Sequence, residues 1–200
     1  MDQTIGVLIA IVSSCLGGSA AAVTRYLSPG TDPITMAILR WAIGFIVVLP
    51  VALLRAKFPP RGDRLSVAIL GIFFFGLFFV FYNIAVGLTT AARASLALST
   101  LPLQTMLVGA LLGIEPLTAR KSLGVAIAMI GVFAALASGL GAAPQGTWRG
   151  EAIMAGAVLC MAFYNVWSRR FIQRSSALGF LTVGMGAGAA VVVAVGVVTG

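Results

Sequence analysis

Long apolar runs alternate with short polar segments along the whole chain. Seven runs have the length of a membrane span, at residues 4–27, 33–54, 65–87, 91–113, 118–140, 150–169 and 178–199. About 20 apolar residues in a helix cross the roughly 30 Å hydrocarbon core of a bilayer. Backbone polar groups in lipid must pair within the segment, so each run is predicted to be helical. The pattern therefore predicts an all-α polytopic membrane protein with seven transmembrane helices.

Composition strengthens this interpretation. Apolar residues make up 60% of the 200-residue chain and charged residues 9%, against about 45–50% and about 25% in soluble domains. The net charge of +8 comes from short basic clusters between the apolar runs, with no continuous basic face and no nucleic-acid-binding motif. We therefore expect the lipid bilayer, and no nucleic acid, as a partner. No feature of the sequence indicates an oligomeric state.

The placement of lysine and arginine predicts the orientation in the membrane. Loops on one predicted side carry nine bases: Arg55, Lys57, Arg61, Arg64, Arg120, Lys121, Arg169, Arg170 and Arg174. The opposite side carries three: Arg25, Arg93 and Arg149. Because short cytoplasmic loops are enriched in these residues, the amino terminus is predicted to be cytoplasmic. The first run lacks a basic segment before it, so we interpret it as a span and not as a cleaved signal peptide.

Several kinds of chemistry are disfavoured by residues that the sequence lacks. It contains no histidine, and Cys15 and Cys160 each lie alone inside an apolar run. We expect these cysteines to be small buried hydrophobic residues, and we expect no metal site, no cofactor and no enzymatic activity. An intramembrane serine protease would need a lysine at membrane depth, and both lysines lie in predicted turns.

A weak internal repeat appears when the chain is shifted by 145 residues. Cys15 then falls on Cys160, and Arg25 on Arg170. The sixth helix would then repeat the first, so each unit would hold five helices and the second unit would enter the membrane from the opposite side. We therefore expect residues 1–145 to form one unit and 146–200 to begin an inverted second unit, as in many secondary transporters.

One long stretch resembles a known family. "SLALSTLPLQTMLVGALLGIEPLTARKSLGVAIAMIGVFAAL" has Pro102 near the middle of one helix, Gly113 and Glu115 at its end, and Gly124 and Gly131 in the next. These features, with "ILRW" and "FFVFYNIAVGLTTAARASL" upstream, resemble the EamA unit of the drug/metabolite transporter superfamily. Within it, the chain is most similar to bacterial aromatic amino-acid exporters of the YddG type. The resemblance implies a ten-helix inverted-repeat (5+5) fold, of which seven helices are present and the remainder is absent.

The resemblance also implies a function. We expect a secondary transporter that exports small neutral or zwitterionic metabolites, with aromatic amino acids as the leading class, by alternating access through a central cavity. The bacterial inner membrane is the expected location. One alternative is import or export of another metabolite or drug. A second is a seven-helix receptor. Two features disfavour it: the chain has no lysine within a helix to bind retinal, and its predicted cytoplasmic amino terminus is the reverse of the usual receptor orientation.

Candidate substrate contacts are polar, aromatic or small residues at membrane depth. Tyr82 and Asn83 need a partner or a wet cavity there, whereas Phe73, Phe74 and Phe75 are expected to face lipid. The full candidate set is Ser14, Gly18, Phe78, Phe79, Tyr82, Asn83, Ser99, Thr100, Pro102, Tyr164 and Trp167.

Each candidate has a structural alternative. Small residues such as Ser14 and Gly18 also allow close helix packing, and Pro102, which cannot donate to the carbonyl of Leu98, also explains a kink. Tyr82 and Trp167 also suit the membrane interface. Tyr164 and Trp167 are predicted nearer the cytoplasmic end than Tyr82, so the aromatic residues would line a path at two depths.

Charged residues supply the last candidates. Arg40 lies within a helix and is expected to extend toward Asp32, to hold a gate closed, or to meet a substrate carboxylate. Glu115 is expected to pair with Arg120 and Lys121 in a cytoplasmic turn. No acid lies near the middle of any predicted helix, which disfavours cationic substrates and proton coupling through a carboxylate.

Overall fold

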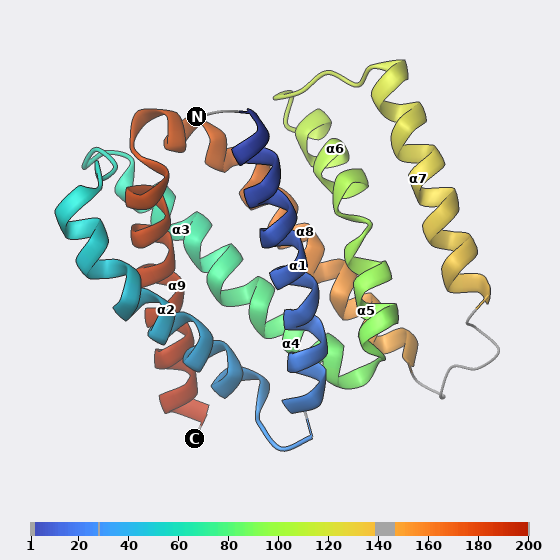
Figure 1. Ribbon diagram of the computed structural model, residues 1–200, viewed down its shortest axis with the longest axis horizontal. Helices are drawn as coiled ribbons and strands as arrows, with labels where there is room; N and C mark the ends of the chain where they lie inside the picture. The colour runs from blue at the N-terminus through green and yellow to red at the C-terminus, as the bar shows by residue number, and fades with distance from the viewer. Residues whose placement is uncertain (1–2, 28, 139–146, 200) are drawn as a thin grey trace.

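A computed structural model describes residues 3–27, 29–138 and 147–199 of the chain, and these residues form helices joined by short turns, without a strand (Figure 1). The helices are α1 (Gln3–Leu27), α2 (Pro33–Arg55), α3 (Arg64–Gly71), the π-helix η1 (Ile72–Phe78), α4 (Phe79–Leu88), α5 (Ala91–Leu98), α6 (Leu101–Leu111), α7 (Ala119–Ser138), α8 (Thr147–Arg174) and α9 (Ala177–Thr199). The predicted loop at 139–146, with the boundary expected between two units, lies outside the described residues.

The described helices provide membrane spans. Six spans are long and apolar enough to cross a bilayer: α1, α2, α3 to α4, α5 to α6, α8 and α9. The predicted span at 118–140 corresponds to α7, whose 20 residues also match the roughly 30 Å of a bilayer core. Because α7 is not among the six, the count of seven stays a prediction, and the class of all-α polytopic membrane protein is confirmed.

The third span changes its helical geometry midway. The segment "IFFFGLF" adopts π-helical turns between α3 and α4, and π-helical turns alter the direction in which successive side chains point. Phe75 is only 1% exposed, and Phe74 stacks on Tyr164 at 4.4 Å between ring centroids. The expectation that Phe74 and Phe75 face lipid is therefore wrong. Phe73, which is 37% exposed, does point outward.

The fourth span is broken at Ser99 and Thr100. Pro102 lies in the first turn of α6 and has no N–H to donate to the carbonyl of Leu98. The N–H of Ser99 turns back to the carbonyls of Ser95 and Leu96, and the Thr100 hydroxyl donates to the carbonyl of Ala97 at 2.7 Å. The break that Pro102 predicts is therefore present, and Ser99 and Thr100 supply hydrogen bonds at that break.

Glycine residues let α9 pack closely between α2 on one side and α3 and η1 on the other. A Cβ atom on Gly71 would overlap the backbone of Gly184, and one on Gly188 would overlap Phe75. On the opposite face of α9, a Cβ on Gly186 would approach the ring of Phe45 to 2.8 Å. The sequence does not distinguish packing from a hinge at these glycines, and the structure shows packing.

Helix α8 packs against α4, α5, α6 and η1. Its buried residues Met154, Ala157 and Val158 join Phe78 and Tyr82 in one core cluster. Helix α7 lies at one edge of the molecule and α1 lies in front of the other helices (Figure 1), and Ser14 and Gly18 are exposed on α1. The open apolar faces of these two helices suit contact with lipid.

Candidate functional site

Four of the predicted aromatic residues, Phe78, Phe79, Tyr82 and Tyr164, form a continuous cluster of rings with Phe74. Phe79 lies 4.7 Å from Phe78 and 6.1 Å from Tyr82, measured between ring centroids. Phe74 stacks on Phe78 at 5.3 Å and on Tyr164 at 4.4 Å. Phe74 thus connects Tyr164 with the rings near Tyr82, although the sequence predicts these two tyrosines at different depths in the membrane. Phe78 and Tyr82 are buried in the core cluster, so in this conformation they contact protein.

Trp167 lies away from Tyr82. Its ring is 5.7 Å from that of Phe163, and both line an apolar pocket of about 420 Å³ together with Phe73 of η1 and Arg170 of α8. The pocket lies between α8 and the third span. The structure therefore separates Trp167 from Tyr82, whereas Trp167 and Tyr164 pack against one buried cluster that contains Phe171 and Phe180.

A larger chamber of about 510 Å³ lies where the fourth span is broken. The chamber is largely open and is bordered by helices α6, α7 and α8. Its lining comprises Leu101, Pro102, Thr105, Met106, Glu115, Arg120, Lys121, Gly124, Val125 and Asn165. The Thr105 hydroxyl is buried and has no hydrogen-bond partner among the described residues. A hydroxyl in this state is suited to a ligand, because a buried polar group without a partner is costly.

Thr105 and Asn165 were not predicted as site residues. Thr105 follows Pro102 by three positions, so both lie on one face of α6, and Asn165 directly follows the predicted Tyr164. These spacings could have identified them. Ser99 and Thr100 do not line the chamber.

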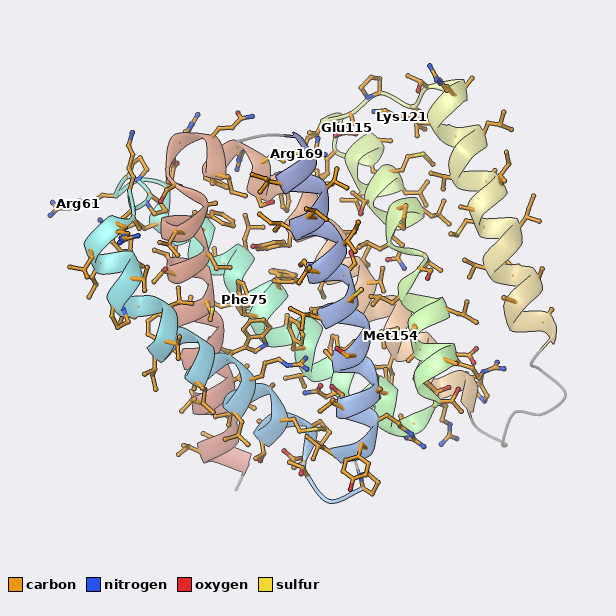
Figure 2. The ribbon with its side chains drawn as sticks, viewed as in Figure 1. Arg61, Phe75, Glu115, Lys121, Met154 and Arg169 are labelled. Atoms are coloured by element: carbon orange, nitrogen blue, oxygen red, sulfur yellow. The ribbon has the colours of Figure 1, made fainter. Side chains whose placement is uncertain are left out.

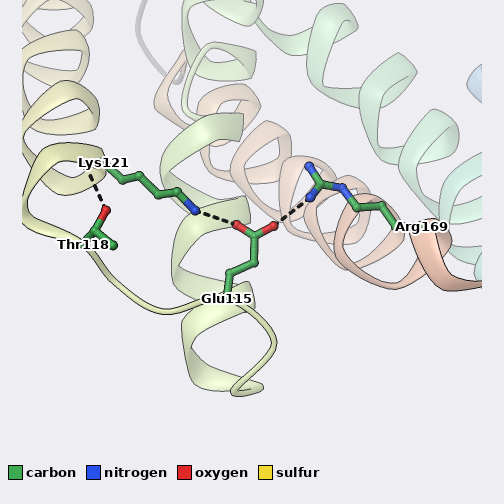
Figure 3. A network of polar contacts seen from close by, with 4 residues as sticks. All are labelled: Glu115, Thr118, Lys121 and Arg169. Atoms are coloured by element: carbon green, nitrogen blue, oxygen red, sulfur yellow. Dashed lines mark hydrogen bonds and ion pairs between the residues drawn. The ribbon is translucent and has the colours of Figure 1, made fainter.

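Glu115 joins three segments at one end of this chamber (Figure 3). Its carboxylate accepts from Lys121 Nζ at 3.3 Å and from Arg169 Nη1 at 2.8 Å. The turn before it is set by Gly113, whose φ of 66° favours glycine. The predicted contact with Lys121 is present, whereas Arg120 lines the chamber without pairing with Glu115. The sequence could not identify Arg169 as the second partner, because it lies 54 residues further on.

Three basic residues that the sequence assigns to one side of the membrane lie at one end of the molecule. Figure 2 shows Arg61, Lys121 and Arg169 in the upper part of the view, the same end at which α1 begins in Figure 1. These three belong to the nine bases that the sequence assigns to one side. Their common position agrees with the alternation of spans that the sequence predicts.

Arg40 and Asp32 take separate partners at the opposite end. The Asp32 carboxylate accepts from the backbone N–H groups of Ile34 and Thr35 at 2.9 and 3.1 Å and caps α2. Arg40 donates to the Thr24 hydroxyl at 3.4 Å and lies 5.3 Å from the centroid of the Phe79 ring. The structure contains no ion pair between Arg40 and Asp32, both of which it describes. The expectation that Arg40 extends to Asp32 is therefore wrong, because the free N–H groups at the start of α2 bind that carboxylate.

The buried amide of Asn83 also contacts α2. Its Nδ2 donates to the carbonyl of Pro33 at 2.9 Å. Asn83 lines a cavity of about 390 Å³ together with Thr24 and Arg40. Of the predicted site residues, Asn83 and Arg40 are thus brought together, at a place separate from the chamber at Pro102.

One ion pair links α8 to the start of α5. The Arg93 guanidinium contacts the Glu151 carboxylate, and their side chains are 11% and 23% exposed. This pair was not predicted. Arg93 and Glu151 lie at the starts of two different predicted helices, 91–113 and 150–169, and both starts are predicted on the same side of the membrane. Helix α8 is therefore held by a carboxylate contact near each end, through Glu151 and through Arg169.

Within the residues that the structure describes, no three of His, Cys, Asp and Glu come together in a way that could hold a metal ion. The polar groups that remain open to a ligand are hydroxyl, amide and guanidinium groups. They can bind a small molecule by hydrogen bonds and charge, and the apolar walls of the chamber can hold a hydrophobic side chain.

Comparison with known proteins agrees with the geometry. Residues 4–137 match the EamA-like transporter family, while the search of curated proteins finds no match. A solved crystal structure is similar over 98% of this chain and 68% of its own, with 21% identity and a TM-score of 0.68, which at this identity shows the fold alone. Because the family match covers more than half of its length, the chain belongs to the EamA-like transporter family, within the drug/metabolite transporter superfamily.

Proposed function

We propose that this membrane transporter exports small neutral or zwitterionic metabolites, with aromatic amino acids as the leading class. The observation that carries the proposal is the chamber of about 510 Å³ between α6, α7 and α8. Its volume falls within the roughly 300–1,000 Å³ of small-molecule sites. Family membership makes transport the function, and it leaves the seven-helix receptor without support.

The lining of the chamber favours a molecule with one apolar part and both charges. Leu101, Met106 and Val125 offer apolar surface, and the Thr105 hydroxyl offers a hydrogen bond. Arg120, Lys121 and Glu115 bring both signs of charge to the same lining. An amino acid could place its carboxylate near Arg120, its ammonium near the oxygen atoms of Thr105 and Asn165, and its side chain against the apolar wall. A cation without a carboxylate would have Glu115 alone, which Lys121 and Arg169 already occupy.

We further propose that the transporter works by alternating access between two units, 1–145 and the inverted unit that begins at 146. The ion pairs at Glu151 and Arg169 support this mechanism, because each links α8 to the first unit near one end of the helix. Breaking the pair of Glu151 while keeping the pairs of Arg169 and Arg174 would open the protein on one side only. The break at Ser99 and Thr100 offers a place for such a movement.

The gathering of bases around Arg61, Lys121 and Arg169 supports a cytoplasmic amino terminus. We therefore place the chamber at Glu115 on the cytoplasmic side and Arg40 toward the outer side of a bacterial inner membrane. This orientation suits an exporter, since the substrate would enter from the cytoplasm.

Transport in liposomes tests the function. The purified protein is expected to release preloaded, labelled phenylalanine, tryptophan, threonine or methionine down a gradient, faster than empty liposomes. Thr105→Val removes the free hydroxyl with little change of shape and should slow phenylalanine flux about tenfold, if one hydrogen bond to the substrate is lost. Thr35→Val, at an exposed position on α2, is the matched control and should leave flux unchanged. Absence of flux for every neutral amino acid would overturn the proposal.

A further inference from the structure

Arg40 has surroundings that are unusual for a charged residue in a membrane helix. It lies seven residues after Pro33, which is about 10 Å along the axis of α2. Thr24 and the ring of Phe79 are its observed contacts. Among the described residues, no carboxylate lies within 4.0 Å of its guanidinium. A charge at such depth is costly unless it is paired or hydrated, and this cost marks it as a candidate for function.

A cavity of about 390 Å³ lies beside Arg40, where α1 ends and α2 begins. Its apolar lining comes from Val23, Leu27, Met36 and Leu39, and its polar lining from Thr24, Thr31, Arg40 and Asn83. Thr24 and Asn83 are 4% and 3% exposed. The cavity therefore combines one positive charge, no negative charge and an apolar wall.

The neighbouring contacts hold this arrangement in place. The Asn83 amide donates to the carbonyl of Pro33 at 2.9 Å and so ties α4 to the first turn of α2. The Phe79 ring lies 5.3 Å from the guanidinium carbon, and a cation over a ring face is attracted to it. Since Asp32 is engaged as the cap of α2, it does not neutralise Arg40. The site is thus positioned for an anion that comes from outside the chain.

We propose that this cavity is a second binding site, which holds the carboxylate of a small molecule with an apolar or aromatic body. The planar guanidinium of Arg40 matches a carboxylate through two parallel hydrogen bonds, and the apolar wall takes the body of the ligand. For the identity of the ligand the proposal rests on the proposed function, since the exported amino acid would occupy this site before it leaves. The site is distinct from the chamber at Pro102, which shares no lining residue with it.

Binding of 3-phenylpropionate and of its uncharged amide, 3-phenylpropanamide, tests the proposal. The purified protein in phosphatidylcholine nanodiscs is expected to bind the carboxylate at least about tenfold more tightly than the amide. A difference of this size corresponds to the loss of one charge-assisted hydrogen bond. Arg40→Gln should abolish this preference, and Arg40→Lys should retain part of it. Arg149→Gln removes one charge from an exposed arginine beside Trp148 and, as the matched control, should retain all of it.

Two results would overturn the site: equal binding of both ligands by the unchanged protein, or a preference that survives Arg40→Gln. If Arg40→Gln does not fold, Thr31→Glu tests the same claim, because a carboxylate in the lining should compete with the ligand and remove its preference. Loss of binding when phosphatidylglycerol replaces part of the lipid would assign Arg40 to a lipid phosphate and contradict a small-molecule site.

The outcome is separable from that of the proposed function. A preference for the carboxylate that depends on Arg40, without flux of any neutral amino acid in liposomes, would support the cavity and contradict amino-acid export. Flux of phenylalanine without any such preference would contradict the cavity and leave export intact.

Discussion

Asp32 and Arg40 lie eight positions apart in the sequence, have opposite charges and nevertheless take different partners. Asp32 binds the N–H groups of Ile34 and Thr35 at the start of α2, and Arg40 points to Thr24 and Phe79. The first N–H groups of a helix have no partner within the helix, so a nearby carboxylate binds them readily. The role of Asp32 is therefore to cap α2.

Substitution of Asp32 distinguishes a cap from an ion pair. Asp32→Ala should lower the free energy of unfolding by about 1 kcal/mol, because two backbone N–H groups lose their acceptor. Asp32→Asn should cost much less, since an amide oxygen also caps a helix. Thermal unfolding in detergent measures both variants. An equal loss in Asn and Ala would show that the negative charge matters and would contradict the role as a cap.

The identity of a residue does not predict whether a phenylalanine in a membrane helix faces lipid or the protein core. Phe73, Phe74 and Phe75 are consecutive and chemically identical, yet Phe73 is 37% exposed and Phe75 is 1% exposed. Hydrophobicity cannot rank them in a membrane protein, because lipid and protein core are both apolar. Pro102 is different: a missing N–H is a property of the residue itself, so the break beside it is predictable.

Helix α8 is the element that connects most of the fold. It packs against six other elements, and its ion pairs include those at Glu151 and at Arg169. The two pairs differ in burial: the side chains of Arg93 and Glu151 are 11% and 23% exposed, against 76% and 41% for Arg169 and Glu115. Because water screens the second pair, the first should contribute more to stability.

Removal of one carboxylate from each pair tests this difference. Glu115→Ala should cost less than about 1 kcal/mol, as for exposed pairs. Glu151→Ala should cost more than that, because it leaves the charge of Arg93 nearly buried without this carboxylate, although less than the roughly 3–5 kcal/mol of a fully buried pair.

Denaturant or thermal unfolding of the two variants gives the comparison. The double variant Arg93→Met with Glu151→Met is the control and should recover most of the loss, because it removes both charges together. Equal losses in the free energy of unfolding for Glu115→Ala and Glu151→Ala would contradict the claim that the less exposed pair contributes more to stability.

The contact between α9 and the third span depends on glycine. Gly188→Ala would force a Cβ against Phe75 and should cost about 1–3 kcal/mol, as overpacking does. Gly156→Ala, on the exposed side of α8 with open space around it, should be neutral or slightly stabilising, because alanine favours a helix. Unfolding temperatures in detergent compare the two. A neutral Gly188→Ala would contradict the close packing.

The helices that the apolar pattern predicts are largely those of the structure. The runs at 33–54 and 178–199 correspond to Pro33–Arg55 and Ala177–Thr199, because bilayer thickness fixes their length. The run at 150–169 becomes Thr147–Arg174, since a helix can continue beyond the membrane through charged residues. The π-helix has no counterpart in the pattern, because it depends on how the phenylalanines pack against α8 and α9.

For the molecule as a whole, the placement of charge supports the proposed orientation. Arg61, Lys121 and Arg169 lie at the end where α1 begins, and the chamber with Glu115 lies at the same end. The candidate site was only partly predictable. Pro102, a predicted site residue, lines the chamber, but Thr105 and Asn165 become neighbours only once α6 packs against α8.

The orientation itself is testable. A reporter that is active only outside the cytoplasm, fused before α1, should be silent, whereas the same reporter inserted in the turn at Gly30 should be active. The physical reason is the excess of bases on the amino-terminal side. Activity of the amino-terminal fusion would reverse the orientation and place the chamber on the outer side.

Efflux of phenylalanine from liposomes tests the central claim most directly. Protein-containing liposomes preloaded with labelled phenylalanine are compared with protein-free liposomes and with liposomes that hold the Thr105→Val variant. We predict efflux that requires the protein, that unlabelled tryptophan inhibits, and that the variant slows about tenfold. Liposomes that contain folded protein and release phenylalanine, tryptophan, threonine and methionine no faster than protein-free liposomes would contradict the claim.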